Sequence, residues 1–112
     1  MNIRKLAIND RELGEIGIAD QFFLRLRGML GRDFSRFDAL LIRPCSEIHT
    51  LFMAYPIDVL FIDKTGQVVR ITENLRPWVP YAGACGARSV IELPAGKAGE
   101  WKIQPEDHVS IL

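Results

Sequence analysis

The sequence predicts a mainly β fold: a compact β-sandwich or jelly-roll-like barrel formed by a single domain over residues 1–112, with one short helix near residues 20–28. Three observations lead to this prediction. A chain of 112 residues has room for one domain of ordinary size. Short apolar runs bounded by Gly, Pro, Asn or Asp follow one another along most of the chain, as in proteins built from many short strands. A single stretch has apolar residues at helical spacing.

The first part of the chain predicts two strands and this helix. Ile3–Ile8 is expected to form a first strand that ends in the turn residues Asn9–Asp10, and a second strand is expected around Glu15–Ala19. Asp20 has the chemistry of a helix N-cap, because its carboxylate can accept a hydrogen bond from the first turn. Gly28 and Gly31 limit the helix to about two or three turns. Its apolar residues recur at helical spacing: Phe22, Phe23, Leu26, Met29 and Leu30.

The rest of the chain is expected to form short strands. The residues Asp63-Lys64-Thr65-Gly66 favour a tight turn, so the strands on either side of it should form a hairpin. The segment Asn74–Gly86 contains two prolines and two glycines and predicts a loop. The expected strands are Ala39–Arg43, Glu47–Met53, Ile57–Ile62, Gln67–Thr72, Ala87–Leu93 and His108–Leu112.

Charge and composition narrow the classes of partner. Fourteen basic and fourteen acidic side chains cancel, and this balance argues against a nucleic-acid partner held by excess positive charge. No apolar run approaches the ~18 residues of a membrane span, and the first residues lack the apolar region of a signal peptide. We therefore expect a soluble cytoplasmic protein, a monomer or weak homodimer, with no nucleic-acid or membrane partner. Cys45 and Cys85 are expected to be reduced thiols, although a single bridge between them is compatible with the sequence.

The segment that begins at Cys45 carries the most unusual chemistry. In a strand over Glu47–Met53, the side chains of His49 and Met53 share a face, and Cys45 continues it. A zinc site needs three or four ligands, and no further ligand has a suitable spacing, so we expect no metal and no cofactor. A Cys45–His49 nucleophile and base is a weaker interpretation, because Cys45 follows a proline and not a helix N-terminus. The structural alternative is a small buried thiol beside a hydrogen-bonded histidine.

Asp58 and the loop around Trp78 are the other two anomalies. Asp58 interrupts an apolar strand, where a carboxylate needs hydrogen bonds or a partner charge. It either ties down the turn at Tyr55-Pro56, pairs with an arginine such as Arg27 or Arg43, or lines a polar pocket with His49. Trp78 lies between prolines and either covers one end of the barrel or presents an aromatic surface to a partner.

Several short motifs follow one another along the chain. They are RGMLGR at 27–32, ALLI at 39–42, CSEIHTLFM at 45–53, PIDVLFID at 56–63 with Gly66 and Val68-Val69, Pro77-Trp78, VIELPAG at 90–96 and Asp107. Their order resembles the family of uncharacterised bacterial and archaeal proteins known as domain of unknown function 192, over roughly residues 12–112. The resemblance implies a compact β-sandwich or jelly-roll-like barrel with a short helix, and it implies no established reaction, cofactor or partner. His49-Thr50 suits a His-Thr subgroup, whereas Ala54 stands where a basic residue is frequent and Glu106 replaces the usual glycine before Asp107.

These observations favour a non-enzymatic module that binds a small molecule or a protein, with no catalytic residues. The predicted binding surface consists of Cys45, His49, Met53, Asp58, Arg27 and Trp78. The alternative is a small enzyme in which His49 acts as acid or base with Asp58 as its partner. A third interpretation is a module that adds a strand to the edge of its own or another sheet.

Overall fold

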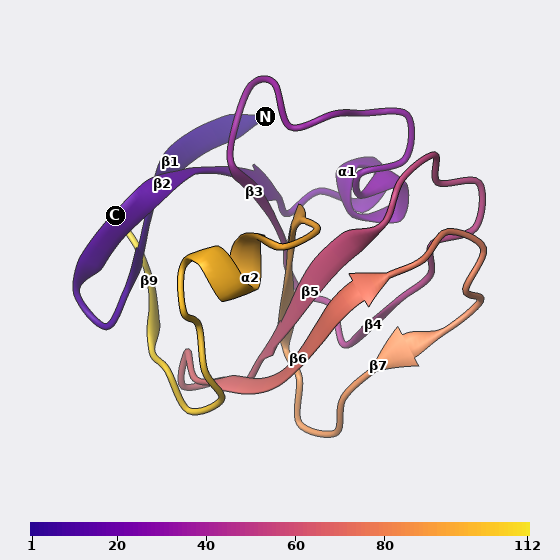
Figure 1. The fold of residues 1–112 in the computed structure, drawn as a ribbon. Helices are drawn as coiled ribbons and strands as arrows, with labels where there is room; N and C mark the ends of the chain where they lie inside the picture. The colour runs from indigo at the N-terminus through magenta and orange to yellow at the C-terminus, as the bar shows by residue number, and fades with distance from the viewer.

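Nine strands and two short helices form the structure (Figure 1), a computed structural model that describes residues 1–112 except for the side chain of Phe23. The predicted place of that side chain on the apolar helix face lies outside the described residues. The elements are β1 (Asn2–Ile8), β2 (Arg11–Ala19), α1 (Phe22–Arg27), β3 (Ala39–Ile42), β4 (Glu47–Ile48), β5 (Ile57–Ile62), β6 (Val68–Leu75), β7 (Ala82–Gly83), β8 (Ser89–Pro94), α2 (Lys97–Glu100) and β9 (Val109–Ile111).

Seven of these strands form one curled sheet in the order β6-β5-β8-β3-β2-β1-β9. Strands β2 and β3 are parallel, whereas β5 is antiparallel to both of its neighbours, β6 and β8. The curl brings the two outer strands together at one end, where Gln67 pairs with His108 and the Val68 N–H donates to Asp107 O at 2.9 Å. The result is a half-barrel, which confirms the predicted mainly β class.

The central strands β3, β5 and β8 are apolar on both faces. In β5, Leu60 and Ile62 lie in the core inside the curl, whereas Val59 and Phe61 lie in a second core on the outer face. Strand β8 alternates in the same way, with Ile91 and Leu93 inside. Burial on both faces explains why these strands have no polar side, and why their only acids, Asp58 of β5 and Glu92 of β8, are buried.

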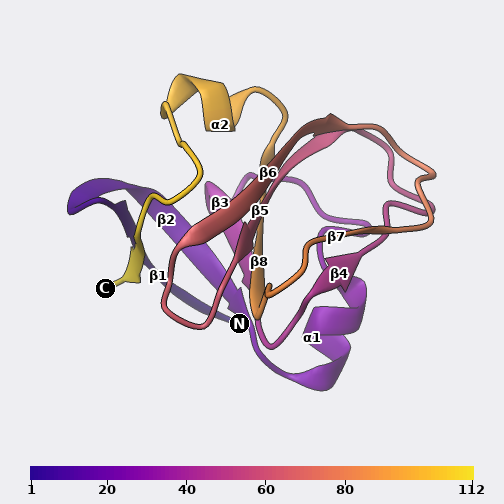
Figure 2. The ribbon, with the colours of Figure 1, turned by 90° about the horizontal axis from the view of Figure 1, so that it is seen from below.

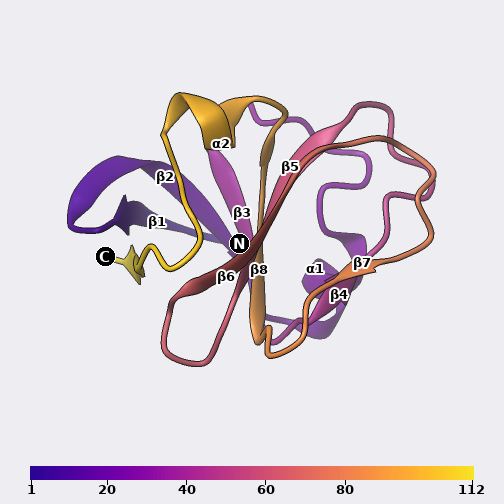
Figure 3. The ribbon, with the colours of Figure 1, turned by 60° about the horizontal axis from the view of Figure 1, so that its bottom comes forward.

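The two helices cover opposite sides of the central strands (Figures 2 and 3). Helix α1 covers the outer face and ends at Gly28, as predicted, but its N-cap is Gln21 and no side chain caps it, so the prediction for Asp20 is wrong. Helix α2 follows a turn and packs Ala98 into the inner core. The sequence did not predict α2, because its four residues are too few to show a helical period.

The segment after Cys45 departs most from the expected strand. Only Glu47–Ile48 is a strand, paired with β7, and the chain then turns around Thr50. Thr50 is fully buried, and its O accepts hydrogen bonds from the N–H groups of Met53 and Trp78. These two bonds, one within the turn and one from the loop at Trp78, use the Thr50 carbonyl in place of a strand ladder. The predicted hairpin is present, because Gly66 N–H donates to Asp63 O between β5 and β6.

Candidate functional site

A cavity of about 160 Å³ lies on the outer face of the sheet, between the end of α1 and the segment that follows Cys45. Four of the six predicted surface residues line it: Arg27, Cys45, His49 and Met53. Ile42 of β3 and Met29 beyond α1 contribute further apolar wall. The structure thus brings most of the predicted residues together, although the expected strand over Glu47–Met53 is absent.

Glu92 is the buried carboxyl of this cavity, and the sequence analysis gave it no role. It lies on β8 opposite Leu40 of β3 and Val59 of β5, and only 4% of it is exposed. Its Oε1 accepts one hydrogen bond, from the N–H of Met29 at 3.1 Å. Among the described residues, no donor bonds its Oε2. The carboxyl is therefore only half satisfied.

Burial sets the protonation of Glu92. Removal from water raises the pKa of its carboxyl from 4.5 to about 7, and the bond from the Met29 N–H opposes this effect only in part. No basic side chain contributes to the balance. Near neutral pH the cavity therefore holds a carboxyl that is divided between its neutral and charged forms.

Gly28 allows α1 to end directly above this carboxyl. Its φ is +53°, a conformation that L side chains rarely adopt. A Cβ at this position would lie 3.2 Å from Glu92 Oε1 and 3.4 Å from Ile42 Cδ1. The glycine therefore permits both the backbone turn and the close approach that brings the Met29 N–H to Glu92.

Cys45 and His49 form part of the cavity wall without contacting each other through a hydrogen bond. The Cys45 thiol is half-buried and donates to Glu47 O at 3.1 Å, and burial raises its pKa, so it is held as a thiol. His49 is exposed, and its Nδ1 accepts the Leu51 N–H at 3.1 Å. Both Cys45 and Cys85 are free.

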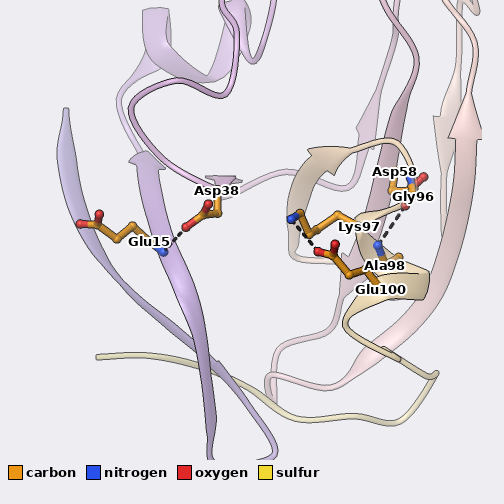
Figure 4. A network of polar contacts seen from close by, with 7 residues as sticks. All are labelled: Glu15, Asp38, Asp58, Gly96, Lys97, Ala98 and Glu100. Carbon is orange, nitrogen blue, oxygen red and sulfur yellow. Dashed lines mark hydrogen bonds and ion pairs between the residues drawn. The ribbon is translucent and has the colours of Figure 1, made fainter.

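Asp58 lies on the opposite face of the sheet from the cavity. It is fully buried, and its Oδ2 accepts the N–H groups of Gly96 and Ala98, both at 3.0 Å (Figure 4). Its Oδ1 accepts the Asn74 N–H at 2.8 Å. The expected ties to the Tyr55-Pro56 turn or to an arginine are thus wrong: Asp58 holds the start of α2 and the end of β6. The His49–Asp58 pair of the enzyme interpretation does not form.

Trp78 is exposed beside the cavity segment and does not cover the end of the barrel. Its ring lies against Phe52 with centroids 4.8 Å apart, and the two residues are 59% and 68% exposed. Thr50 ties the segment that contains Phe52 to the loop that contains Trp78. Its Oγ1 donates to Arg76 O at 2.7 Å and accepts the Val79 N–H at 2.9 Å. Phe52 and Trp78 both have positive φ, near 66°, a strained conformation for aromatic residues.

The described residues contain no group of three His, Cys, Asp or Glu side chains placed to hold a metal ion. Over the same residues, no helix is long and apolar enough to cross a membrane.

Two solved structures share the fold. A crystal structure from Sinorhizobium meliloti, whose description proposes a transcription regulator, matches with a TM-score of 0.86 over 98% of this chain and 94% of its own length. A protein of unknown function from Novosphingobium aromaticivorans matches with a TM-score of 0.84 over 96% of this chain and 84% of its own. Identities of 19% and 20% mean that these likenesses show the fold alone.

The sequence relatives are archaeal proteins named UPF0127. The protein from Thermococcus sibiricus is 36% identical over 74% of this chain, which spans 56% of that relative's length. The protein from Pyrococcus horikoshii is 38% identical over 74% of this chain and 75% of its own length. The model of the DUF192 family, described as Uncharacterized ACR, matches residues 4–111. The chain therefore belongs to the DUF192 family.

Proposed function

We propose that this chain is a non-enzymatic binding module that holds a small, mainly apolar molecule in the cavity beneath α1, with a hydrogen bond from that molecule to Glu92. The observation that carries the proposal is the unpartnered Oε2 of a carboxyl that is otherwise almost fully buried. The Oε2 atom is not closed off from solvent, so a donor on a molecule that enters the cavity can reach it.

The size and walls of the cavity support a ligand of a few heavy atoms. A volume of about 160 Å³ is close to that of an engineered cavity, about 150 Å³, which binds benzene. Met29 and Met53 line it, and methionine side chains adapt to ligands of different shape. The arrangement favours an apolar ligand body with one hydrogen-bond donor.

The enzyme alternative has little support from the geometry. Asp58 uses three backbone N–H groups on the far side of the sheet, so it does not orient His49. The Cys45 thiol has a raised pKa, which opposes a role as nucleophile. Protein binding remains a second candidate, favoured by the exposed Phe52–Trp78 pair, because exposed and strained aromatics are frequent at recognition surfaces.

A fragment screen followed by amide chemical shifts in ¹⁵N-labelled protein tests the small-molecule proposal. The screen should include apolar fragments that carry one hydroxyl, amine, amide or carboxyl group. We expect hits that shift the amides of Gly28, Met29 and Glu92, and weaker binding to Glu92→Leu. The matched control is Glu12→Leu on the exposed part of β2. If no fragment moves these amides at millimolar concentration, the cavity holds only water and the proposal is wrong.

A further inference from the structure

We infer that the molecule bound in this cavity is a small organic cation, an alkyl- or arylammonium, whose nitrogen donates to Glu92 Oε2. This inference rests on the binding site proposed above and specifies the chemistry of its ligand. The reason is that, in the part of the chain that the structure describes, no cationic side chain pairs with Glu92. A buried carboxylate is stable only when an opposite charge or several donors accompany it.

Neither arginine of the cavity wall makes a hydrogen bond or a salt bridge to Glu92 in the described residues. Arg27 Nε donates to Leu30 O at 2.9 Å, so its guanidinium closes the end of α1. Arg25 Nη1 donates to Pro44 O at 3.3 Å, whereas its Nε is buried and has no hydrogen-bond partner among the described residues. An ammonium ligand would supply the missing counter-charge and the missing donor with one atom.

The rest of the cavity distinguishes an organic cation from a metal ion. A hard metal ion requires about six oxygen ligands, and Glu92 offers one free oxygen. The walls are instead the apolar side chains of Ile42, Met29 and Met53. An alkyl or aryl body would remove these surfaces from water while the nitrogen reaches the carboxyl.

Binding of such a cation requires the charged form of Glu92. When Glu92 is neutral, its O–H bond breaks and one proton passes to solvent for each ammonium that binds. Affinity must therefore rise with pH until Glu92 is ionised in the free protein. The other charged or titratable groups that face the cavity or act on this carboxyl are Arg25, Arg27, Cys45, Glu47, His49 and Tyr55.

Three probes of one shape test the inference: cyclohexylammonium, cyclohexanol and cyclohexanecarboxylate, titrated against ¹⁵N-labelled protein at pH 6 and pH 8. We expect cyclohexylammonium to bind about tenfold more tightly than cyclohexanol at pH 8. Its affinity should rise about tenfold from pH 6 to pH 8, because Glu92 ionises near pH 7. Both differences should disappear in Glu92→Gln and persist in Glu12→Gln.

The outcomes separate the two proposals. If cyclohexanol or the carboxylate binds as tightly as the amine, the cation inference is wrong and the binding site stands. If the rise with pH persists in Glu92→Gln and is lost in His49→Gln, a different group titrates and the inference is also wrong. If no probe moves the amides of Gly28 and Met29, the binding site itself fails.

Discussion

The protonation of Glu92 should make the stability of the folded protein depend on pH. In the folded state, burial raises the pKa of this carboxyl from 4.5 to about 7, whereas in the unfolded chain it returns to its ordinary value. Between these values the folded protein holds a proton that the unfolded chain has released. Stability from this group is therefore fully present below about pH 4.5 and is lost as pH rises to about 7.

The size of the effect follows from the two pKa values. At about 1.4 kcal/mol for each pKa unit, a change from 4.5 to about 7 corresponds to about 3 kcal/mol. Of this loss in the free energy of unfolding, about 2 to 3 kcal/mol should occur between pH 5 and pH 8. For a domain of this length, that is on the order of 10 °C in Tm.

Urea unfolding of the wild type and Glu92→Gln across this range measures the effect. Glutamine keeps an acceptor for the Met29 N–H and carries no charge. The free energy of unfolding of Glu92→Gln should therefore not show the decrease between pH 5 and pH 8 that is expected for the wild type. Both proteins contain His49 and His108, so the contributions of these histidines cancel when the two unfolding free energies are subtracted at each pH. Glu12→Gln should follow the wild type. Parallel pH profiles for wild type and Glu92→Gln, within about 0.5 kcal/mol, would refute the reasoning about Glu92.

Three further substitutions probe the elements that shape the site, each measured by urea unfolding. Thr50→Val leaves Val79 N–H and Arg76 O without their side-chain partner and should cost about 2 to 3 kcal/mol, with a change in tryptophan fluorescence from the loop. Gly28→Ala should cost about 1 to 3 kcal/mol, because the new Cβ meets a strained φ and the Glu92 carboxyl. Asp58→Asn replaces one acceptor oxygen by an NH₂ group that faces backbone donors and should cost about 2 to 4 kcal/mol. An Asp58→Asn protein that is as stable as the wild type would contradict its structural role.

The strands were predictable where burial imposes a simple pattern. Ile57–Ile62 is buried on both faces, and its apolar residues, interrupted only by Asp58, predicted β5 with the observed bounds. Glu47–Met53 was also predicted as a strand, with its side chains assigned to alternate faces, yet most of it turns. The difference is Thr50, whose side chain bonds residues 26 and 29 positions further along the chain. Alternation reports which face a residue would take in a strand, and it contains no information about such distant partners.

The candidate site was predictable in part for the same reason. Cys45, His49 and Met53 are close in sequence, so they stay close whether the segment is a strand or a turn. Asp58 was correctly placed on the face of Leu60 and Ile62, but its partners lie 16 to 40 positions away. Glu92 had a visible signal, a charge within the apolar run of β8. Its place in a cavity could not be inferred from the sequence, because the cavity forms only where the end of α1 lies over Glu92.

The two acids of the central sheet differ in a way that favours the proposed binding role for Glu92 and a structural role for Asp58. They lie on adjacent strands, where Asp58 pairs with Leu93 and Val59 with Glu92, so they are neighbours that point to opposite faces. Both are buried, but Asp58 accepts three backbone N–H groups and Glu92 accepts one. Three donors make a buried carboxylate a stable tie between elements, whereas one donor leaves the charged form destabilised. Above neutral pH, replacement of Asp58 by Asn should therefore weaken the fold, and replacement of Glu92 by Gln should strengthen it. If Glu92→Gln is more stable than the wild type, folding alone does not account for a carboxylate at this position, and that result would support the proposed binding role.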